Sequence, residues 1–245
     1  MLVDDLVILA NDQAGKSFVA ALNRRDGTLR WKTPRKSQKA AYATPCLYRP
    51  REGAASQLIL ASWAHGLSSL HPRTGKTLWE YGPFPNRVVG SPILASGLVI
   101  ASCGSGGGGH LTVAVRPGDP ARGIEPELVY EVEKARPYVV TPVTRGPLLF
   151  LWADAGIVSC LDAPTGKLHW RKRVGGKFFG SPVRVGERLY ALSRDGDAVV
   201  LAAEDRYALL GRVPLGEPSH ATPAVSDGVM YLRTLSHLMA LEGKK

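Results

Sequence analysis

Cysteine is scarce in this sequence of 245 residues, which has only Cys46, Cys103 and Cys160. Their number is odd and no two have metal-ligand spacing, so neither a disulfide framework nor a zinc site is expected. Buried free thiols are the expected state of all three. Long apolar runs are also absent, since none approaches the roughly 18 residues of a membrane-spanning helix. The start at Met1 lacks the basic and apolar regions of a signal peptide.

Signatures of common catalytic sites are absent as well. There is no HExxH zinc motif, no GxSxG nucleophile elbow and no EF-hand loop. The glycine-rich run from Gly104 to Gly109 lacks the Lys-Ser/Thr and the helix of a phosphate-binding loop, so a hairpin tip is expected there. The six histidines are scattered without metal-ligand spacing. We therefore predict no catalytic, cofactor-binding or metal-binding residue.

Acidic residues are outnumbered, because 21 Asp and Glu stand against 31 Lys and Arg, for a net charge of +10. Such an excess is typical of proteins with an anionic partner, such as nucleic acid, a polyanionic glycan or lipid headgroups. The alternative is an arginine-rich surface that is merely solvated. We expect a protein or an anionic polymer as the partner, rather than nucleic acid.

What the sequence does contain is a motif that returns every 40 to 50 residues. A hydroxyl residue followed by proline opens each unit, in Thr44-Pro45, Ser91-Pro92, Thr141-Pro142, Ser181-Pro182 and Thr222-Pro223. Self-similarity at this period indicates a repeat architecture.

Each repeat contains short apolar runs separated by turns. After the proline come a short run and a glycine turn, then strongly apolar runs such as Leu148 to Trp152 and Ile157 to Leu161. A fourth run often carries tryptophan, and no segment keeps a helical period over about 12 residues. Four strands per repeat predict the antiparallel blade of a β-propeller. Asp12, Asp154 and Asp195 fall in polar turns, where aspartate normally caps the backbone.

The proline predicts the position of its strand. Proline has no amide proton to donate to a sheet, so it belongs at an edge strand or at a strand start. We therefore expect the proline strand to be the innermost of each blade, beside a channel. The hydroxyl before it is expected to satisfy one backbone group.

The repeat closes with a turn and a tryptophan in three good copies, which end at Trp31, Trp79 and Trp170. Large aromatic rings suit the outermost strand, where they pack between blades, so we predict a structural docking role for these three. Two copies are degenerate. One runs from Val115 through an insertion to Tyr130, and the other, Ala202 to Leu210, lacks both the glycine and the tryptophan.

The closing run from Leu161 to Trp170, LDAPTGKLHW, resembles the tryptophan-docking repeat of quinoprotein-like (PQQ-repeat, BamB-like) β-propellers. That family includes both pyrroloquinoline quinone (PQQ) alcohol dehydrogenases and non-catalytic envelope assembly factors. The resemblance covers nearly the whole chain and implies a periplasmic or extracytoplasmic location. In the dehydrogenases a tryptophan and a disulfide between adjacent cysteines clamp the quinone, and acidic residues hold calcium. This chain has no adjacent cysteines and no comparable acidic cluster, so we expect neither PQQ nor calcium.

The repeats predict one all-β domain over residues 1–245. About six units are expected, and the first and last are incomplete. The first has its proline strand missing or reduced to Leu2-Val3, and the last stops after a third strand at Leu238 to Leu241. Either six units form a small ring, or they are part of a larger propeller.

Cations recur five or six residues before the proline in four units, as Lys39, Arg87, Arg136 and Lys177. In a propeller these positions recur on one face near the channel mouth, so we predict a positive collar that binds an acidic ligand. Tyr42, Phe179 and His220 lie three residues before their prolines. They are expected either to extend this surface or to pack.

The leading functional hypothesis is a non-catalytic propeller scaffold for protein or polymer binding. By resemblance it would be an accessory factor of envelope assembly. Two alternatives remain open. One is a PQQ-dependent or sugar-linked oxidoreductase, and the other is a sensor or carbohydrate-binding module of a larger protein.

Overall fold

The computed structural model describes residues 1–243 and confirms the all-β prediction. Its 23 strands form six antiparallel sheets, and the described residues contain no α-helix and one 3-10 turn, Pro120–Arg122. No helix in this range is long and apolar enough to cross a membrane. The chain divides into two compact units, which are residues 1–133 and the residues from Lys134 onward.

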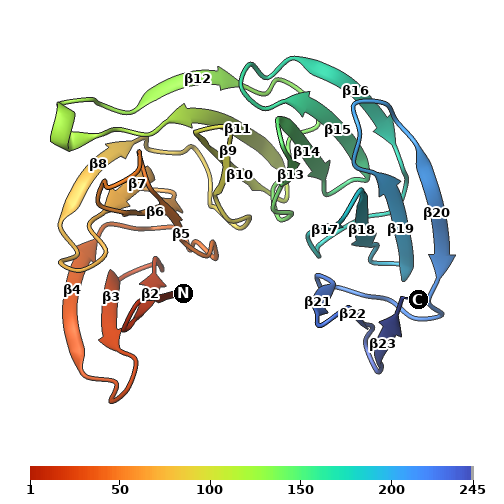
Figure 1. Cartoon of the computed structure of the whole chain (residues 1–245), viewed down its shortest axis with the longest axis horizontal. Helices are drawn as coiled ribbons and strands as arrows, with labels where there is room; N and C mark the ends of the chain where they lie inside the picture. The colour runs from red at the N-terminus through yellow and green to blue at the C-terminus, as the bar shows by residue number, and fades with distance from the viewer. Residues whose placement is uncertain (244–245) are drawn as a thin grey trace. The chain divides into compact units, whose positions relative to one another are not determined.

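The first unit contains three four-stranded blades, coloured red to green in Figure 1. Blade 1 comprises β1 (Leu2–Val3), β2 (Leu6–Asn11), β3 (Ser17–Asn23) and β4 (Leu29–Arg35). Blade 2 comprises β5 (Cys46–Tyr48), β6 (Gln57–Ser62), β7 (Gly66–Leu70) and β8 (Thr77–Tyr81). Blade 3 comprises β9 (Ile93–Ala95), β10 (Leu98–Ser105), β11 (Gly108–Arg116) and β12 (Glu127–Glu131).

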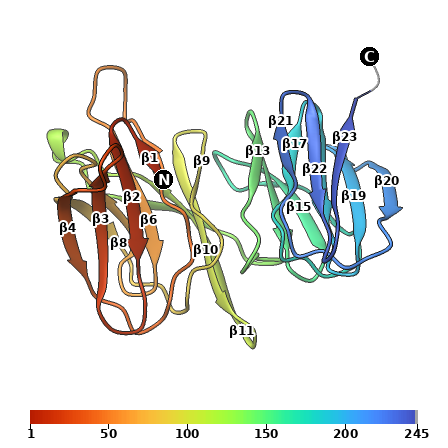
Figure 2. The ribbon, with the colours of Figure 1, turned by 90° about the horizontal axis from the view of Figure 1, so that it is seen from below.

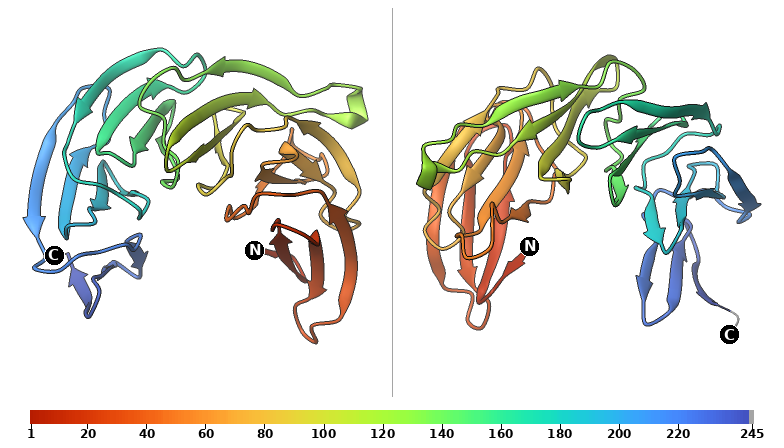
Figure 3. Two further views of the ribbon diagram at one scale, coloured as in Figure 1. Left: turned by 180° about the vertical axis from the view of Figure 1, so that it is seen from behind. Right: turned by 45° about the horizontal axis from the view of Figure 1, so that its top comes forward.

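The second unit contains two four-stranded blades and one three-stranded blade. Blade 4 comprises β13 (Val143–Arg145), β14 (Leu148–Ala153), β15 (Ile157–Asp162) and β16 (Leu168–Arg173). Blade 5 comprises β17 (Val183–Val185), β18 (Arg188–Leu192), β19 (Asp197–Ala202) and β20 (Leu209–Pro214). Blade 6 comprises β21 (Ala224–Ser226), β22 (Val229–Arg233) and β23 (Leu238–Glu242). Figure 3 shows β16 and β20 along the same margin of this unit.

The proline strands lie where the sequence predicted. Each of β5, β9, β13, β17 and β21 begins one residue after its proline and forms an edge of its sheet. All five prolines are buried. An edge position needs no amide proton on one side, so proline fits there without the loss of a ladder hydrogen bond.

The hydroxyl residues before these prolines link neighbouring blades. The Ser91 hydroxyl accepts a hydrogen bond from the Thr44 amide at 2.9 Å. In the second unit the Ser181 hydroxyl accepts from the Thr141 amide, and the Thr222 hydroxyl accepts from the Ser181 amide, each at 2.9 Å. Each hydroxyl thus satisfies an amide of the preceding blade, which explains why the motif needs Ser or Thr rather than an apolar residue.

The hydrophobic core lies between blades. One cluster joins β2 and β3 to the face of β6, a second joins blades 2 and 3, and a third joins blades 4 and 5. Strands covered on both faces read as continuous apolar runs, as in the fully buried residues Leu149 to Trp152 of β14. A single blade therefore cannot bury its own apolar faces.

Trp31 lies between its own strand and the next blade. The ring is 9% exposed, and its indole N–H donates to the Pro72 carbonyl at 2.9 Å. Gly75, in the same turn as Pro72, has φ of +70°, and a Cβ there would lie 2.4 Å from the Trp31 ring. The Thr33 hydroxyl adds a bond to the Gly75 carbonyl at 2.7 Å. This glycine is required both by its backbone conformation and by the indole that covers it.

Trp170 repeats this contact in the second unit. Its indole N–H donates to the Glu204 carbonyl of blade 5 at 3.0 Å, and its ring meets Tyr207 edge-on at 5.3 Å. Trp79 uses a relay instead. Its N–H donates to the Gln57 side-chain oxygen at 2.6 Å, and the Gln57 amide donates to the Gly118 carbonyl at 2.9 Å.

The two degenerate repeats differ at the same docking position. Every four-stranded blade has a β-bulge between its third and fourth strands. The fourth-strand residue paired beside this bulge, in blades 1 to 5 respectively, is Trp31, Trp79, Tyr130, Trp170 and Gly211. Blade 5 therefore has no ring at all where the others have one. An added Cβ on Gly211 would meet no atom within 4 Å.

A buried ion pair lies between blades 1 and 2. The Arg35 guanidinium donates to both carboxylate oxygens of Asp12, at 3.0 and 3.2 Å, and to the hydroxyls of Ser62 and Ser68. The sequence predicted a backbone-capping role for this aspartate, which is wrong for its side chain. Asp154 does cap backbone amides, those of Tyr138 and Val139.

The glycine-rich run is shorter as a loop than the sequence suggested. Strands β10 and β11 continue to Ser105 and Gly108, so Gly106 and Gly107 alone form the turn. Figure 2 shows this hairpin as a long projection of the first unit.

We expect Trp170→Ala to lower the free energy of unfolding by about 3 to 5 kcal/mol, because the ring and its hydrogen bond are both lost from an interface between blades. Urea denaturation followed by fluorescence or circular dichroism measures this. His169→Ala changes an exposed neighbour on the same strand and should stay within about 0.5 kcal/mol. A loss below about 1 kcal/mol for Trp170→Ala contradicts the docking role.

Two glycines, Gly75 under a docked ring and Gly211 at a docking position without a ring, should respond oppositely to alanine. Gly75→Ala should destabilise by more than about 1 kcal/mol, because φ is positive and the Trp31 ring leaves no room. Gly211→Ala should stabilise by about 0.4 to 1 kcal/mol, because the site is open and the unfolded chain loses freedom. Equal effects of the two substitutions in urea denaturation contradict this account.

Candidate binding surfaces

Each blade has two distinct ends. The turns between strands one and two and between strands three and four lie at one end, which we call the hairpin end. The turn between strands two and three and the linker to the next blade lie at the other, the linker end. Lys39, Arg87, Arg136 and Lys177 all lie in such linkers, so each unit presents two of the predicted collar cations at its linker end.

In the first unit Lys39 contacts an aromatic ring. Its ammonium lies 5.6 Å from the centre of the Trp63 ring and donates to the Pro85 carbonyl at 3.1 Å. Tyr42 follows in the same linker and is 61% exposed, while Arg87 in the next linker is exposed as well. The linker end of this unit therefore combines an exposed phenol ring with two cations.

In the second unit the corresponding residues form one contiguous group. The Arg194 guanidinium lies 4.3 Å from the centre of the Phe179 ring, and Phe179 and His220 are 5.6 Å apart at a tilt of 59°. Phe179 is 41% exposed, and Lys177 and His220 are exposed too. We call Lys177, Phe179, Arg194 and His220 the Phe179 patch.

Sequence reasoning missed Trp63 and Arg194. Both lie in turns between a second and a third strand, Trp63 after β6 and Arg194 after β18. Antiparallel topology places these turns at the same end of a blade as the linkers. The predicted order of strands and turns was therefore enough to place Trp63 and Arg194 at the linker end.

Two carboxylates at the linker end of the second unit are engaged within the protein. Asp154 accepts the two amides of its neighbouring linker. Glu217 accepts from the Ser236 hydroxyl at 2.7 Å and the Thr234 hydroxyl at 2.8 Å, and contacts His237 at 2.6 Å. Hydrogen bonds from Ser236 and Thr234 are the main causes that lower the pKa of Glu217 from 4.5 to about 2.

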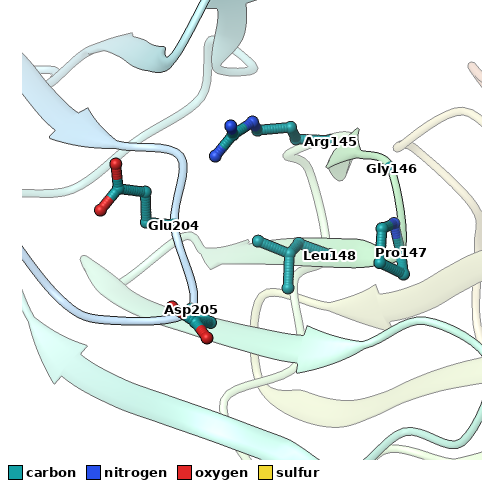
Figure 4. Close-up of a pocket in the computed structure, with 6 residues that line it drawn as sticks. All are labelled: Arg145, Gly146, Pro147, Leu148, Glu204 and Asp205. Carbon is teal, nitrogen blue, oxygen red and sulfur yellow. The ribbon is translucent and has the colours of Figure 1, made fainter.

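A separate pocket lies at the hairpin end of blades 4 and 5. It measures about 630 Å³ and is lined by Arg145, Gly146, Pro147, Leu148, Glu204 and Asp205. Figure 4 shows the two carboxylates and the guanidinium around the opening. The Arg145 guanidinium is already bound to the Ala203 carbonyl at 2.8 Å and paired with Glu187. The guanidinium of this pocket is therefore already engaged in contacts that join blades 4 and 5.

Chemistry-bearing side chains are dispersed. The three thiols lie in β5, β10 and β15, which belong to three different blades. Desolvation by burial raises the pKa of Cys46 to about 11 and that of Cys160 to about 12. Among residues 1–243 no three His, Cys, Asp or Glu side chains gather as metal ligands. The described linker ends present aromatic rings and cations instead.

Comparison with known proteins places these blades in a family. The family model described as outer membrane protein assembly factor BamB matches residues 1–123 and 119–209. Similar solved structures include BamB from Moraxella catarrhalis, with a TM-score of 0.71 and 15% identity, over 98% of this chain and 68% of that one. At this identity the likeness shows the β-propeller fold alone.

Two further similar proteins are enzymes by name. The quinohemoprotein alcohol dehydrogenase from Comamonas testosteroni has a TM-score of 0.65 and 14% identity, over 95% of this chain and 50% of that one. The tetrathionate hydrolase of Acidithiobacillus ferrooxidans is 27% identical over 124 residues, which cover 44% of this chain. That match spans 25% of the hydrolase, so the likeness concerns a quarter of its length.

Glu217 should make stability depend on pH in the acid range. Its pKa is lowered by folding, so its contribution is complete above about pH 4.5 and is lost as the pH falls towards about 2. We expect the difference in unfolding free energy between the native chain and Glu217→Gln to be constant at neutral pH and to shrink below about pH 4.5. Urea denaturation at each pH measures it, with Glu242→Gln as the exposed control. A difference that does not change with pH would refute this role.

Proposed function

Because the chain belongs to the family of the outer membrane protein assembly factor BamB, we propose that it is a non-catalytic β-propeller scaffold that binds a protein or polymer partner through its linker ends. One observation supports this most directly. At the linker end of each unit a cation lies over an aromatic ring, Lys39 over Trp63 in the first unit and Arg194 over Phe179 in the second. Each linker end also has an exposed ring, which is Tyr42 in the first unit and Phe179 itself in the second. Aromatic residues and arginine are the side chains most enriched where proteins bind partners.

The blade architecture suits a binding role. Rigid sheets hold the linkers in place, and residues on such loops carry recognition in many folds. Backbone hydrogen bonds tie these linkers to neighbouring blades, as in the bonds from the Tyr42 amide to the Val88 carbonyl and from the Phe178 amide to the Asp154 carbonyl. A surface that is ordered before binding loses less entropy when the partner arrives. By family membership we propose envelope assembly as the setting.

The alternative of a quinone-linked oxidoreductase has less support from the residues. A quinone clamp of the kind found in related dehydrogenases uses adjacent cysteines, whereas these thiols belong to separate blades. The carboxylates of the pocket between blades 4 and 5, Glu204 and Asp205, lie at the hairpin end beside an arginine that already has partners. Fold similarity to an enzyme does not by itself transfer an activity.

Two measurements test the scaffold function. Titration with PQQ and Ca²⁺ should produce no saturable change in absorbance, and no dye reduction should follow when alcohols or sugars are added. The immobilised chain should retain a partner from envelope extracts or a glycan array, and salt above about 0.15 M should weaken that binding. Saturable quinone binding with dye reduction would overturn the proposal.

Charge variants locate the surface. Lys39→Glu with Arg87→Glu reverses two linker-end cations, and Arg24→Glu with Arg25→Glu reverses two exposed cations at the hairpin end of blade 1. We expect partner retention to fall in the first double variant and to persist in the second. Equal loss in both would show that net charge, rather than the linker end, is responsible.

A further inference from the structure

We propose that the Phe179 patch binds an acidic peptide segment, with carboxylates on Arg194 and Lys177 and an aromatic or apolar side chain against Phe179 and His220. This inference rests on the scaffold function proposed above and specifies the partner of one of its surfaces. It concerns the second unit alone, because all four residues of the patch belong to blades 4 to 6 or their linkers.

Arg194 is positioned for a ligand. Its guanidinium is stacked on Phe179, with 4.3 Å between the guanidinium carbon and the ring centre. Stacking fixes the plane of the guanidinium, and a planar fork of donors matches a carboxylate. The Arg194 backbone is held as well, because its amide donates to the Lys177 carbonyl at 2.7 Å and its carbonyl accepts from the Ser219 amide.

The base of the patch is rigid. A Cβ on Gly180 would lie 2.2 Å from the Ala221 carbonyl, so the two linkers run in direct backbone contact beside Phe179 and His220. The bond from the Ser181 amide to the Thr222 hydroxyl closes this contact at 2.9 Å. The rings and the guanidinium are therefore presented by backbone that does not need to be ordered on binding.

A hollow next to the ring pair offers space for a side chain. It measures about 290 Å³ and is lined by His220, Ala221, Arg233, Thr234 and Leu235. Leu235, one of the lining residues, is 64% exposed and offers an apolar contact. An apolar residue two positions from a bound carboxylate would reach this hollow, because alternate residues of an extended segment point to the same side.

The available charge favours an acidic segment of modest charge. Lys177 and Arg233 are exposed and join Arg194, whereas Glu217 and Asp154 are engaged within the protein. Asp195 is the exposed acidic residue next to Arg194, and its charge opposes an anionic ligand. Glu217 keeps its negative charge as well, since its pKa is lowered to about 2. Three cations that are partly offset by carboxylates, together with two rings and a leucine, suit a mixed acidic and aromatic peptide better than a highly charged polymer.

Fluorescein-labelled octapeptides test the proposal by anisotropy titration of the full chain. The probe (Glu-Tyr)4 supplies both chemistries, (Glu-Ser)4 lacks the rings and (Lys-Tyr)4 reverses the charge. We expect saturable binding of (Glu-Tyr)4, binding about tenfold weaker for (Glu-Ser)4, and none for (Lys-Tyr)4.

Four variants assign the binding to the patch. Phe179→Ala and Arg194→Gln should each weaken (Glu-Tyr)4 binding by about tenfold. The affinity of Arg194→Lys should lie between those of the native chain and Arg194→Gln. Asp195→Asn should strengthen binding by a few fold. Arg188→Gln removes an exposed cation at the hairpin end of blade 5 and should leave binding unchanged. Circular dichroism and urea denaturation verify that each variant folds. If Phe179→Ala does not fold, Phe179→Leu is used in its place.

Three outcomes overturn the inference. These are no saturable binding of (Glu-Tyr)4, binding that the patch variants do not affect, and tighter patch-dependent binding of heparin or phosphatidylglycerol vesicles, which would assign the patch to a polyanion or a membrane. Retention of a partner that depends on Lys39 and Arg87 would survive any of these results. Failure of this inference is therefore distinguishable from failure of the scaffold function.

Discussion

The contact on which the rest of the structure depends is the one between an outer-strand indole and the next blade. A blade is apolar on both faces, so it is stable only when a neighbour covers each of them. Trp31 and Trp170 meet this need at the outer margin, where the ring covers a turn and its N–H satisfies a carbonyl of that turn. At the inner margin a serine or threonine hydroxyl satisfies a backbone amide of the neighbouring blade.

Because contacts at the outer and inner margins hold neighbouring blades together, the two ends of each blade can carry different contacts. At the hairpin end, ion pairs such as Arg51 with Asp119 and Arg73 with Asp4 join one blade to the next. The linker end has an ion pair between blades too, the buried one of Arg35 with Asp12, and it also carries backbone hydrogen bonds and exposed rings and cations.

The repeat made much of the fold predictable from the sequence. Strand number, the edge position of the proline strands, the two-residue first strand Leu2–Val3 and the missing fourth strand of blade 6 all followed from local patterns, because hydrogen bonding and side-chain alternation are properties of each segment. Blade 1 was expected to be incomplete, but it has four strands. The four cations of the predicted collar lie in linkers between blades, and their binding of an acidic ligand stays a prediction. Arg194 and Trp63 were missed, since their importance comes from rings or lysines that lie 15 or more residues away in the sequence.

By itself the sequence determined the meander, its period and the residues at each strand edge, since a short window contains all the information needed to pair adjacent strands. Only the tertiary structure decided which turn each side chain reaches. Asp12 pairs with Arg35 rather than capping a turn, Trp79 requires Gln57 as a relay, and Gly211 stands where other blades place a ring. Such contacts depend on the distance between neighbouring sheets, and no local pattern encodes that distance.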